Sequence, residues 1–309
     1  MDKIIMNQTL IMLILIFAGI ICAKTKIISK ETNKDLSRFV LQVVNPVTIF
    51  MSYQKDYETR LVKNLITAFL LSVLAFGVII ACAYILVRNK KDRDTEVERF
   101  ASIYSNCGFM GIPLMNALFG SEGVFYLTAY ITVFNLVVWT HGVIMISGEK
   151  NFKSVIKVFY SPTIIAIILG LITFFCRIRL PEIPSSALTF IEHINTPMAM
   201  IVSGVTISSS DIPNMLKNYR IYYISAVKLL IIPIVLSFVL SPMSVDEKVR
   251  MTVMVAGSAP PASMGTLFCL KYGKNSLYAS EIFTAGTLLS AVTLPLVVKF
   301  TESLTNLFT

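Results

Sequence analysis

Two apolar segments of the chain hold the residues whose types and spacing suit the binding of a solute. The first segment, 105–113, has two glycines and a proline within six residues, and such a composition does not sustain a regular helix. The second segment, 257–263, contains two consecutive prolines, which remove two backbone donors and push the residue before each proline out of the helical region. We therefore predict an interrupted helix in both segments.

Interrupted helices have a defined binding chemistry. Each interruption creates a half-helix amino terminus with free N–H groups and a partial positive charge. In a membrane, such backbone groups are tolerated where protein buries them or where they line a watery cavity. Two such ends that meet near mid-membrane attract a carboxylate or a similar anion, although proline kinks that serve packing alone are the alternative. The predicted substrate-binding residues are Ser105, Asn106, Gly108, Gly111, Pro113, Ser258, Pro260, Pro261 and Ser263.

Two charged residues lie inside segments that are otherwise apolar. Lys228 lies about nine residues into the segment that begins at 219, and Glu281 lies near the start of the segment 276–299. A lysine at the bilayer centre costs about 2.5–3.5 kcal/mol on insertion scales, so Lys228 should face the protein interior or extend to the interface. Both residues are candidates for ion coupling or gating, and a structural ion pair or an interfacial position is the alternative.

Residue patterns typical of catalysis and metal binding are missing. The sequence has two histidines, no H-E-x-x-H motif and no Walker A motif, so it carries neither a zinc-protease nor a nucleotide signature. Its five cysteines lie in apolar stretches and form no C-x-x-C pair, which indicates packing residues rather than a metal site or disulfides. We therefore predict no enzyme activity, no cofactor and no metal.

The composition places these segments in a membrane. Of the 309 residues, 55% are hydrophobic and 15% are charged, and the mean hydropathy is +0.73. A globular chain has about 25% charged residues, and so few charges cannot cover a surface that faces water. The net charge of +9 is explained by basic cytoplasmic loops. The sequence therefore predicts an all-α polytopic membrane protein that binds no nucleic acid.

Ten segments approach the roughly 20 apolar residues that a membrane helix needs, although polar interruptions leave nine or eleven open. Lys and Arg concentrate in alternate loops when both termini are placed outside, which favours that orientation in the cell (plasma) membrane. The first segment continues into basic residues without a small-residue cleavage site, which favours an uncleaved span. The ranges are 5–23, 36–53, 63–87, 96–119, 122–147, 160–178, 187–208, 219–240, 248–270 and 276–299.

Several landmarks recur along the chain at an offset near 150 residues. Asn45 and Asn195, each close to a proline, are 150 residues apart, and Pro113 and Pro260 are 147 residues apart. A short glycine-containing hairpin follows each interrupted segment. This pattern predicts two halves of five helices, and because five is odd the halves cross the bilayer in opposite senses, an inverted repeat that recurs in secondary transporters. The predicted halves are residues 1–150, with helices one to five, and residues 151–309, with helices six to ten.

The run Ser-Asn-Cys-Gly-Phe-Met-Gly-Ile-Pro-Leu at 105–114 resembles the auxin efflux carrier family, including its bacterial members often called malate permeases. The Ala-Pro-Pro-Ala run at 259–262 and the Thr-Leu-Pro run at 293–295 are similar too, and the resemblance covers nearly the whole chain. It implies ten helices in a 5+5 inverted repeat, with broken helices four and nine that cross at their prolines and form the substrate site. It also implies a scaffold of helices one, two, six and seven, and a moving transport domain formed by the others.

Two departures from the plant members limit what the resemblance implies about the substrate. Plant members carry a long cytoplasmic loop between the halves, whereas here only residues 148–158 lie there. They also place charged residues in the third helix beside the site, and residues 65–87 contain none. An indole-acetate substrate is therefore not carried over, and a small mono- or dicarboxylate is the family-level expectation.

The predicted function is secondary transport of a small organic anion by alternating access at the crossing of helices four and nine. A membrane ligand sensor or an assembly subunit that does not translocate its ligand is the alternative, and a membrane enzyme is a third class. The expected partners are the anion, the lipid bilayer and a coupling proton or sodium ion, and a homodimer is left open.

Overall fold

The computed structural model describes residues 2–90, 93–148, 160–210 and 212–308. Every named element within these residues is a helix, as the composition predicts. In chain order, with η marking a π-helix, the elements are α1 (Asp2–Lys24), α2 (Lys30–Phe39), η1 (Val40–Val44), α3 (Asn45–Ser52), α4 (Thr59–Leu86), α5 (Thr95–Ile103), η2 (Cys107–Gly111), α6 (Ile112–Val137), η3 (Val138–Gly142), α7 (Val143–Ser147), α9 (Pro162–Phe175), α10 (Glu182–His193), α11 (Asn195–Ser208), α12 (Ile212–Lys217), α13 (Tyr219–Ala226), η4 (Val227–Ile231), α14 (Ile232–Leu240), α15 (Glu247–Ser258), α16 (Met264–Lys271) and α17 (Ser276–Thr305).

Helices occupy each of the ten predicted ranges, but not all of them are uninterrupted. The all-helical prediction is confirmed, whereas the number ten and the 5+5 arrangement stay predictions. The predicted boundary between the halves, at residue 150, lies outside the described residues. Within the described part of the chain, the helices long and apolar enough to cross a membrane are Ile4–Lys24, Thr59–Leu86, Cys107–Ser147, Tyr219–Leu240 and Ser276–Thr305.

Prolines explain three of the π-helices. η1, η2 and η4 each begin six residues before a proline, which is Pro46, Pro113 or Pro233 and lies in the first turn of the following α-helix. Because proline has no N–H, the carbonyl four residues before it loses its α-helical partner, and the backbone can widen to i→i+5 bonds. The three prolines therefore set local widenings of the helix, a feature that is frequent at functional sites.

Both predicted hairpins turn on a glycine. Gly120 has a φ of 59° and Gly273 a φ of 65°, a left-handed conformation that costs glycine little and strains other residues. Gly120 divides α6 into two helical runs that meet at a kink. The predicted fourth and fifth helices therefore end and begin at this residue.

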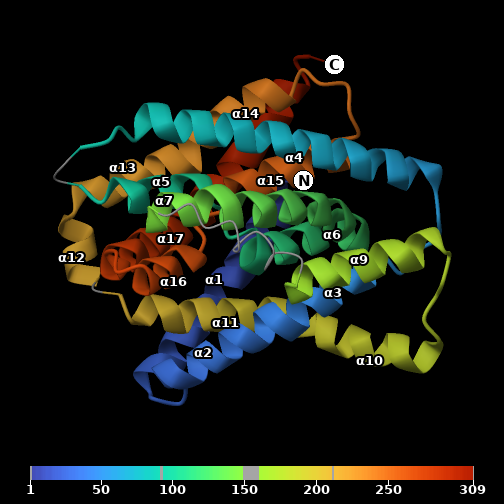
Figure 1. Cartoon of the computed structure of the whole chain (residues 1–309), viewed down its shortest axis with the longest axis horizontal. Helices are drawn as coiled ribbons and strands as arrows, with labels where there is room; N and C mark the ends of the chain where they lie inside the picture. Colours follow the sequence, from blue (N-terminus) through green and yellow to red (C-terminus); the bar gives the residue numbers. More distant parts are fainter. Residues whose placement is uncertain (1, 91–92, 149–159, 211, 309) are drawn as a thin grey trace.

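The helices pack in two groups, and each group draws on both predicted halves. In the first group, α1 packs along α11, α3 packs on α9 and α10, and α2 packs on α11. In the second, α4, α6 and α15 pack together, and α17 packs on α13, α14 and α16. Figure 1 shows α2, α3, α9, α10 and α11 in the lower part of the view, and α4, α13 and α14 in the upper part. The first group contains the predicted helices one, two, six and seven.

Two glycines bring α1 and α11 into close contact. A Cβ atom on Gly19 would overlap the backbone oxygen of Ile201, and one on Gly204 would overlap that of Ile16. Small residues that let two helix backbones approach are typical of membrane helix packing. The close contact fixes α11, whose first residue is Asn195, against the first helix of the chain.

Candidate functional site

The fourth predicted helix is interrupted between α5 and η2. After α5, Tyr104 is extended (φ −90°, ψ 115°), and Asn106 also leaves the helical region (φ −79°, ψ 53°). The chain becomes helical again in η2, which contains Gly108 and Gly111, and Pro113 lies in the first turn of α6. The predicted interruption is therefore present, with Asn106 at its carboxyl end.

The ninth predicted helix is interrupted between α15 and α16. α15 ends at Ser258, and Ala259 is extended (φ −58°, ψ 150°). Pro260 and Pro261 follow, and α16 begins directly after Ser263. Because a proline disfavours the helical conformation of the residue before it, the two prolines account for the extended stretch.

The two interruptions lie against each other and pair through their backbones. The N–H of Asn106 donates to the carbonyl oxygen of Pro260 at 2.7 Å, and the N–H of Ala262 donates to that of Tyr104 at 2.9 Å. The central residues of the two segments form an isolated antiparallel β-bridge. The crossing thus uses two of the amides freed by the interruptions, so these two are not available to a bound solute.

The polar side chains at the crossing differ in whether their hydrogen-bond donors already have an acceptor. Asn106 is buried, with 5% of its surface exposed, and no partner for its Nδ2 lies within the described residues. Ser105 Oγ lies 3.2 Å from the hydroxyl of Tyr130. Ser258 Oγ donates to the carbonyl oxygen of Met254, in its own helix, at 2.7 Å. Asn106 therefore offers an unused donor, whereas the hydroxyl hydrogen of Ser258 is already engaged.

An asparagine pair beside the crossing was not assigned to the site from sequence. Asn195 Nδ2 donates to Asn45 Oδ1 at 2.7 Å, both residues are buried, and Asn195 Oδ1 has no partner among the described residues. A Cβ atom on Gly108 would lie 3.4 Å from Asn45 Nδ2, so the pair lies next to η2. The available signal was the recurrence of an asparagine near a proline at an offset of 150 residues.

Lys228 lies at the carboxyl ends of both interrupted helices. It is fully buried, and its Nζ lies 3.1 Å from the carbonyl oxygen of Gly257 and 3.5 Å from that of Ile103. Ile103 is the last residue of α5, and Gly257 is the last but one of α15. Among the described residues, the hydrogen-bond partners of Lys228 are these carbonyls.

α17 runs directly beside the crossing. A Cβ atom on Gly286 would overlap the ring of Pro261, so the absence of a side chain at residue 286 lets the helix approach. Glu281 lies five residues earlier on the same helix and is buried, with 7% of its surface exposed. Glu281 therefore belongs to the helix that packs on the crossing.

Ion pairs tie the outer ends of the interrupted helices together. Glu122, near the start of the second run of α6, lies 2.6 Å from Lys248 and 2.9 Å from Arg60. Glu96, in the first turn of α5, lies 4.0 Å from Lys274, in the hairpin after α16. Glu96 and Lys248 are 152 residues apart, as are Glu122 and Lys274. The two ties thus occupy equivalent positions with the charges exchanged, as the predicted duplication would produce.

A buried ion pair joins α5 to α13 and α17. Glu98 is 1% exposed and accepts two hydrogen bonds from the Arg220 guanidinium, at 2.8 and 2.7 Å, and one from the Tyr278 hydroxyl at 3.0 Å. A buried carboxylate needs such partners, because removing one of them leaves an uncompensated charge. Glu98 therefore links these three helices, through contacts between residues far apart in the sequence.

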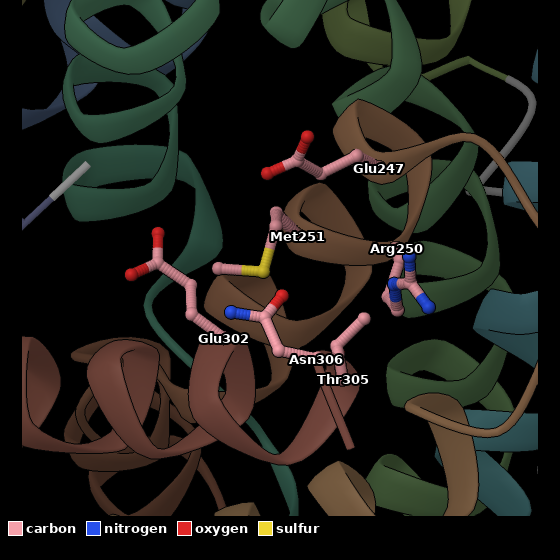
Figure 2. A pocket seen from close by; sticks show the side chains of 6 residues that line it. All are labelled: Glu247, Arg250, Met251, Glu302, Thr305 and Asn306. Carbon is pink, nitrogen blue, oxygen red and sulfur yellow. The ribbon is translucent and has the colours of Figure 1, made fainter. Parts of the chain in front are cut away.

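A pocket of about 230 Å³ lies at the opposite end of α15 from the crossing, between α15 and α17 (Figure 2). Figure 2 shows the Met251 side chain between the carboxylates of Glu247 and Glu302. The Arg250 guanidinium donates to the carbonyl oxygens of Ser241 and Met243. None of the predicted substrate-binding residues lines this pocket, so the candidate site is the crossing.

A model of the family described as membrane transport proteins matches the chain twice, over residues 4–153 and 149–298. The chain belongs to this family. It is the auxin efflux carrier family that the motifs resemble, so that resemblance is confirmed. Members of this family are membrane transporters and not enzymes.

Two relatives named as transporters are similar to this chain over nearly their full length. An "Uncharacterized transporter" of Methanothermobacter thermautotrophicus is 26% identical over 299 residues, which cover 94% of this chain and 96% of the relative. The "Uncharacterized transporter MJ1031" of Methanocaldococcus jannaschii is 26% identical over 302 residues, which cover 91% of this chain and 94% of the relative. The likeness therefore extends over both interrupted helices and is not confined to one part of the chain.

Proposed function

We propose that this member of the membrane transport protein family is a secondary transporter that moves a small organic anion, a mono- or dicarboxylate, by alternating access at the crossing. Family membership and the transporter relatives support membrane transport. The observation that carries the choice of an anion is the buried Nδ2 of Asn106, a donor without a partner in the described residues, at the edge of an interrupted helix.

The groups beside Asn106 suit a carboxylate and a hydroxyl. η2 and α6 follow Asn106, and the amino end of a helix carries a partial positive charge that favours an anion. The Asn106 amide donates to the carboxylate, which is an acceptor only. Asn195 Oδ1 is an acceptor without a partner in the described residues, and it suits the hydroxyl group of a hydroxy acid such as malate.

The two packing groups supply a route for alternating access. Asn45 and Asn195 lie in the group of α1, α3, α9 and α11, whereas Asn106 lies in the group of α5, α6 and α15. The groups meet where α1 packs on α17, α3 on α6 and α11 on η2. A solute held between the asparagine pair and Asn106 becomes accessible from either side of the membrane when one group shifts against the other.

Uptake of radiolabelled malate into proteoliposomes tests this proposal. Asn106→Ala removes a hydrogen bond to a charged group, worth about 1.5–3 kcal/mol, and we expect uptake at subsaturating malate to fall roughly tenfold or more. Asn33→Ala is the matched control: Asn33 is buried and bonds Thr206 Oγ1 at 3.1 Å in the other packing group, so uptake should persist.

The outcomes separate the alternatives. Normal uptake by Asn106→Ala would place the binding site elsewhere. Binding of malate by the wild type without time-dependent accumulation would indicate a membrane sensor or an assembly subunit rather than a transporter.

A further inference from the structure

Lys228 owes its position to the π-helix η4. Pro233 lies six residues after the first residue of η4, and its missing N–H accounts for the local widening of the helix. η4 packs against α5, α15 and α17. The lysine side chain is thereby directed into the second packing group, at the level of the crossing, where none of its surface is exposed.

The two atoms that face Lys228 Nζ are helix-end carbonyl oxygens. Gly257 O, at 3.1 Å, belongs to the last turn of α15, and Ile103 O, at 3.5 Å, ends α5. The last carbonyls of a helix have no intrahelical partner and carry a partial negative charge. Two such ends converge on one point here because both helices are interrupted at the crossing, and a positive charge between them offsets their repulsion.

In transporters with discontinuous helices, carbonyls of this kind coordinate an inorganic cation. We propose that the Lys228 ammonium occupies the crossing's cation site, so that the chain itself supplies the positive charge that a metal ion would otherwise bring to the carboxyl ends of α5 and α15. The site is therefore selective for an ammonium group, and removing Lys228 leaves a cavity that accepts a small monovalent cation.

One further consequence of this inference rests on the proposed function. In this proposal, the Lys228 ammonium places a positive charge in the same packing group as Asn106. A single fixed charge balances a single carboxylate, so the loaded crossing is neutral with a monoanion and needs no sodium ion to reach neutrality. Monocarboxylates, or the monoanionic form of a dicarboxylate, are then the preferred substrates.

Thermal unfolding of the purified Lys228→Ala variant tests the cation site independently of transport. Melting is measured in sodium, potassium, methylammonium and N-methylglucamine chloride at equal ionic strength, because N-methylglucamine is too large for the vacated space. We expect the variant to melt about 5–10 °C below the wild type in N-methylglucamine, and methylammonium to restore most of the difference in a saturable manner. Lys299→Ala, at an exposed position of α17, should melt like the wild type, with no difference among the salts.

Two further variants test the proposal if the Lys228→Ala protein does not fold. Lys228→Arg keeps the charge and should melt near the wild type, whereas Lys228→Met keeps the length without the charge and should melt well below it or fail to fold. The proposal is overturned if Lys228→Met is as stable as the wild type, or if Lys228→Ala loses stability equally in all four salts. Neither result bears on whether the wild type transports an organic anion, so failure here is distinguishable from failure of the proposed function.

Discussion

The two interruptions that form the crossing are built from different residues and contribute different things. The fourth-helix interruption runs from Tyr104 to Asn106 and is followed by Gly108 and Gly111 in η2, and the Asn106 amide donor is without a partner in the described residues. The ninth-helix interruption consists of Pro260 and Pro261, and the hydroxyl hydrogen of Ser258 is given to its own helix. Under the proposed function, the ninth helix holds the crossing in place, while the fourth helix and the asparagine pair supply the groups that would recognise the solute.

Restoring a continuous ninth helix should have the largest effect on uptake. Alanine is about 3 kcal/mol more favourable than proline per residue in a helix interior, so Pro260→Ala with Pro261→Ala favours a continuous ninth helix. That helix would withdraw the Pro260 carbonyl from the Asn106 N–H. We expect malate uptake by proteoliposomes to fall to background, while Pro184→Ala, on the exposed helix α10, keeps uptake. Wild-type uptake by the double variant would show that the prolines are not needed to hold the crossing.

Breaking the asparagine pair should have a smaller effect, which is measured as a loss of stability. It should also reveal energetic coupling between the predicted halves. Asn45→Ala or Asn195→Ala leaves a buried amide without its partner, which costs about 1–3 kcal/mol. Because the two side chains bond each other at 2.7 Å, the double variant should lose less than the sum of the single losses, by about 1 kcal/mol or more. Thermal unfolding of the three variants measures this coupling, and strictly additive losses would argue that the bond contributes nothing.

A methyl group at the glycine nearest to the pair should have an intermediate effect on transport. The Cβ of Gly108→Ala would lie 3.4 Å from Asn45 Nδ2, and a displacement of that amide costing about 1 kcal/mol would lower uptake roughly fivefold. Gly77→Ala is the matched control, since nothing lies within 4 Å of its added carbon. That control should gain about 0.5–1 kcal/mol of stability with unchanged uptake. Equal uptake by the two variants would contradict a role for the region between Gly108 and Asn45.

Removing the Ser258 hydroxyl should have the smallest effect. Its hydrogen is donated to Met254 O, so it is not available to a carboxylate, and its loss should change stability by no more than about 1 kcal/mol. Ser105→Ala, which removes the contact with the Tyr130 hydroxyl, should reduce uptake more. Uptake kinetics of the two variants side by side test the assignment of recognition to the fourth helix, and a larger loss in Ser258→Ala would reverse it.

The positions of the interruptions could be predicted from local sequence. Glycine and proline act on the backbone within a few residues, so the segments 105–113 and 257–263 were found without knowledge of tertiary contacts. The hairpin glycines Gly120 and Gly273 were found for the same reason, and both have a positive φ. The cost of placing a charge in lipid predicted that Lys228 faces the protein interior or extends to the interface, and the structure has it buried.

The partners of these residues could not be predicted, because each lies far away in the sequence. The pairing of Asn106 N–H with Pro260 O, the bond between Asn45 and Asn195, and the contact of Lys228 with Ile103 O all join residues more than 100 positions apart. Periodicity and composition report which face of a helix is apolar, and they do not report which distant carbonyl lies opposite a given donor.

The most direct test of the account is time-dependent accumulation of radiolabelled malate and of small monocarboxylates by proteoliposomes that contain the wild type or Asn106→Asp. The substitution keeps the size of the side chain but replaces its donor with a negative charge. The account predicts saturable accumulation by the wild type and none by Asn106→Asp, at equal amounts of folded protein. Accumulation of the same anion at the wild-type rate by Asn106→Asp, or of none of these anions by the wild type, would contradict it.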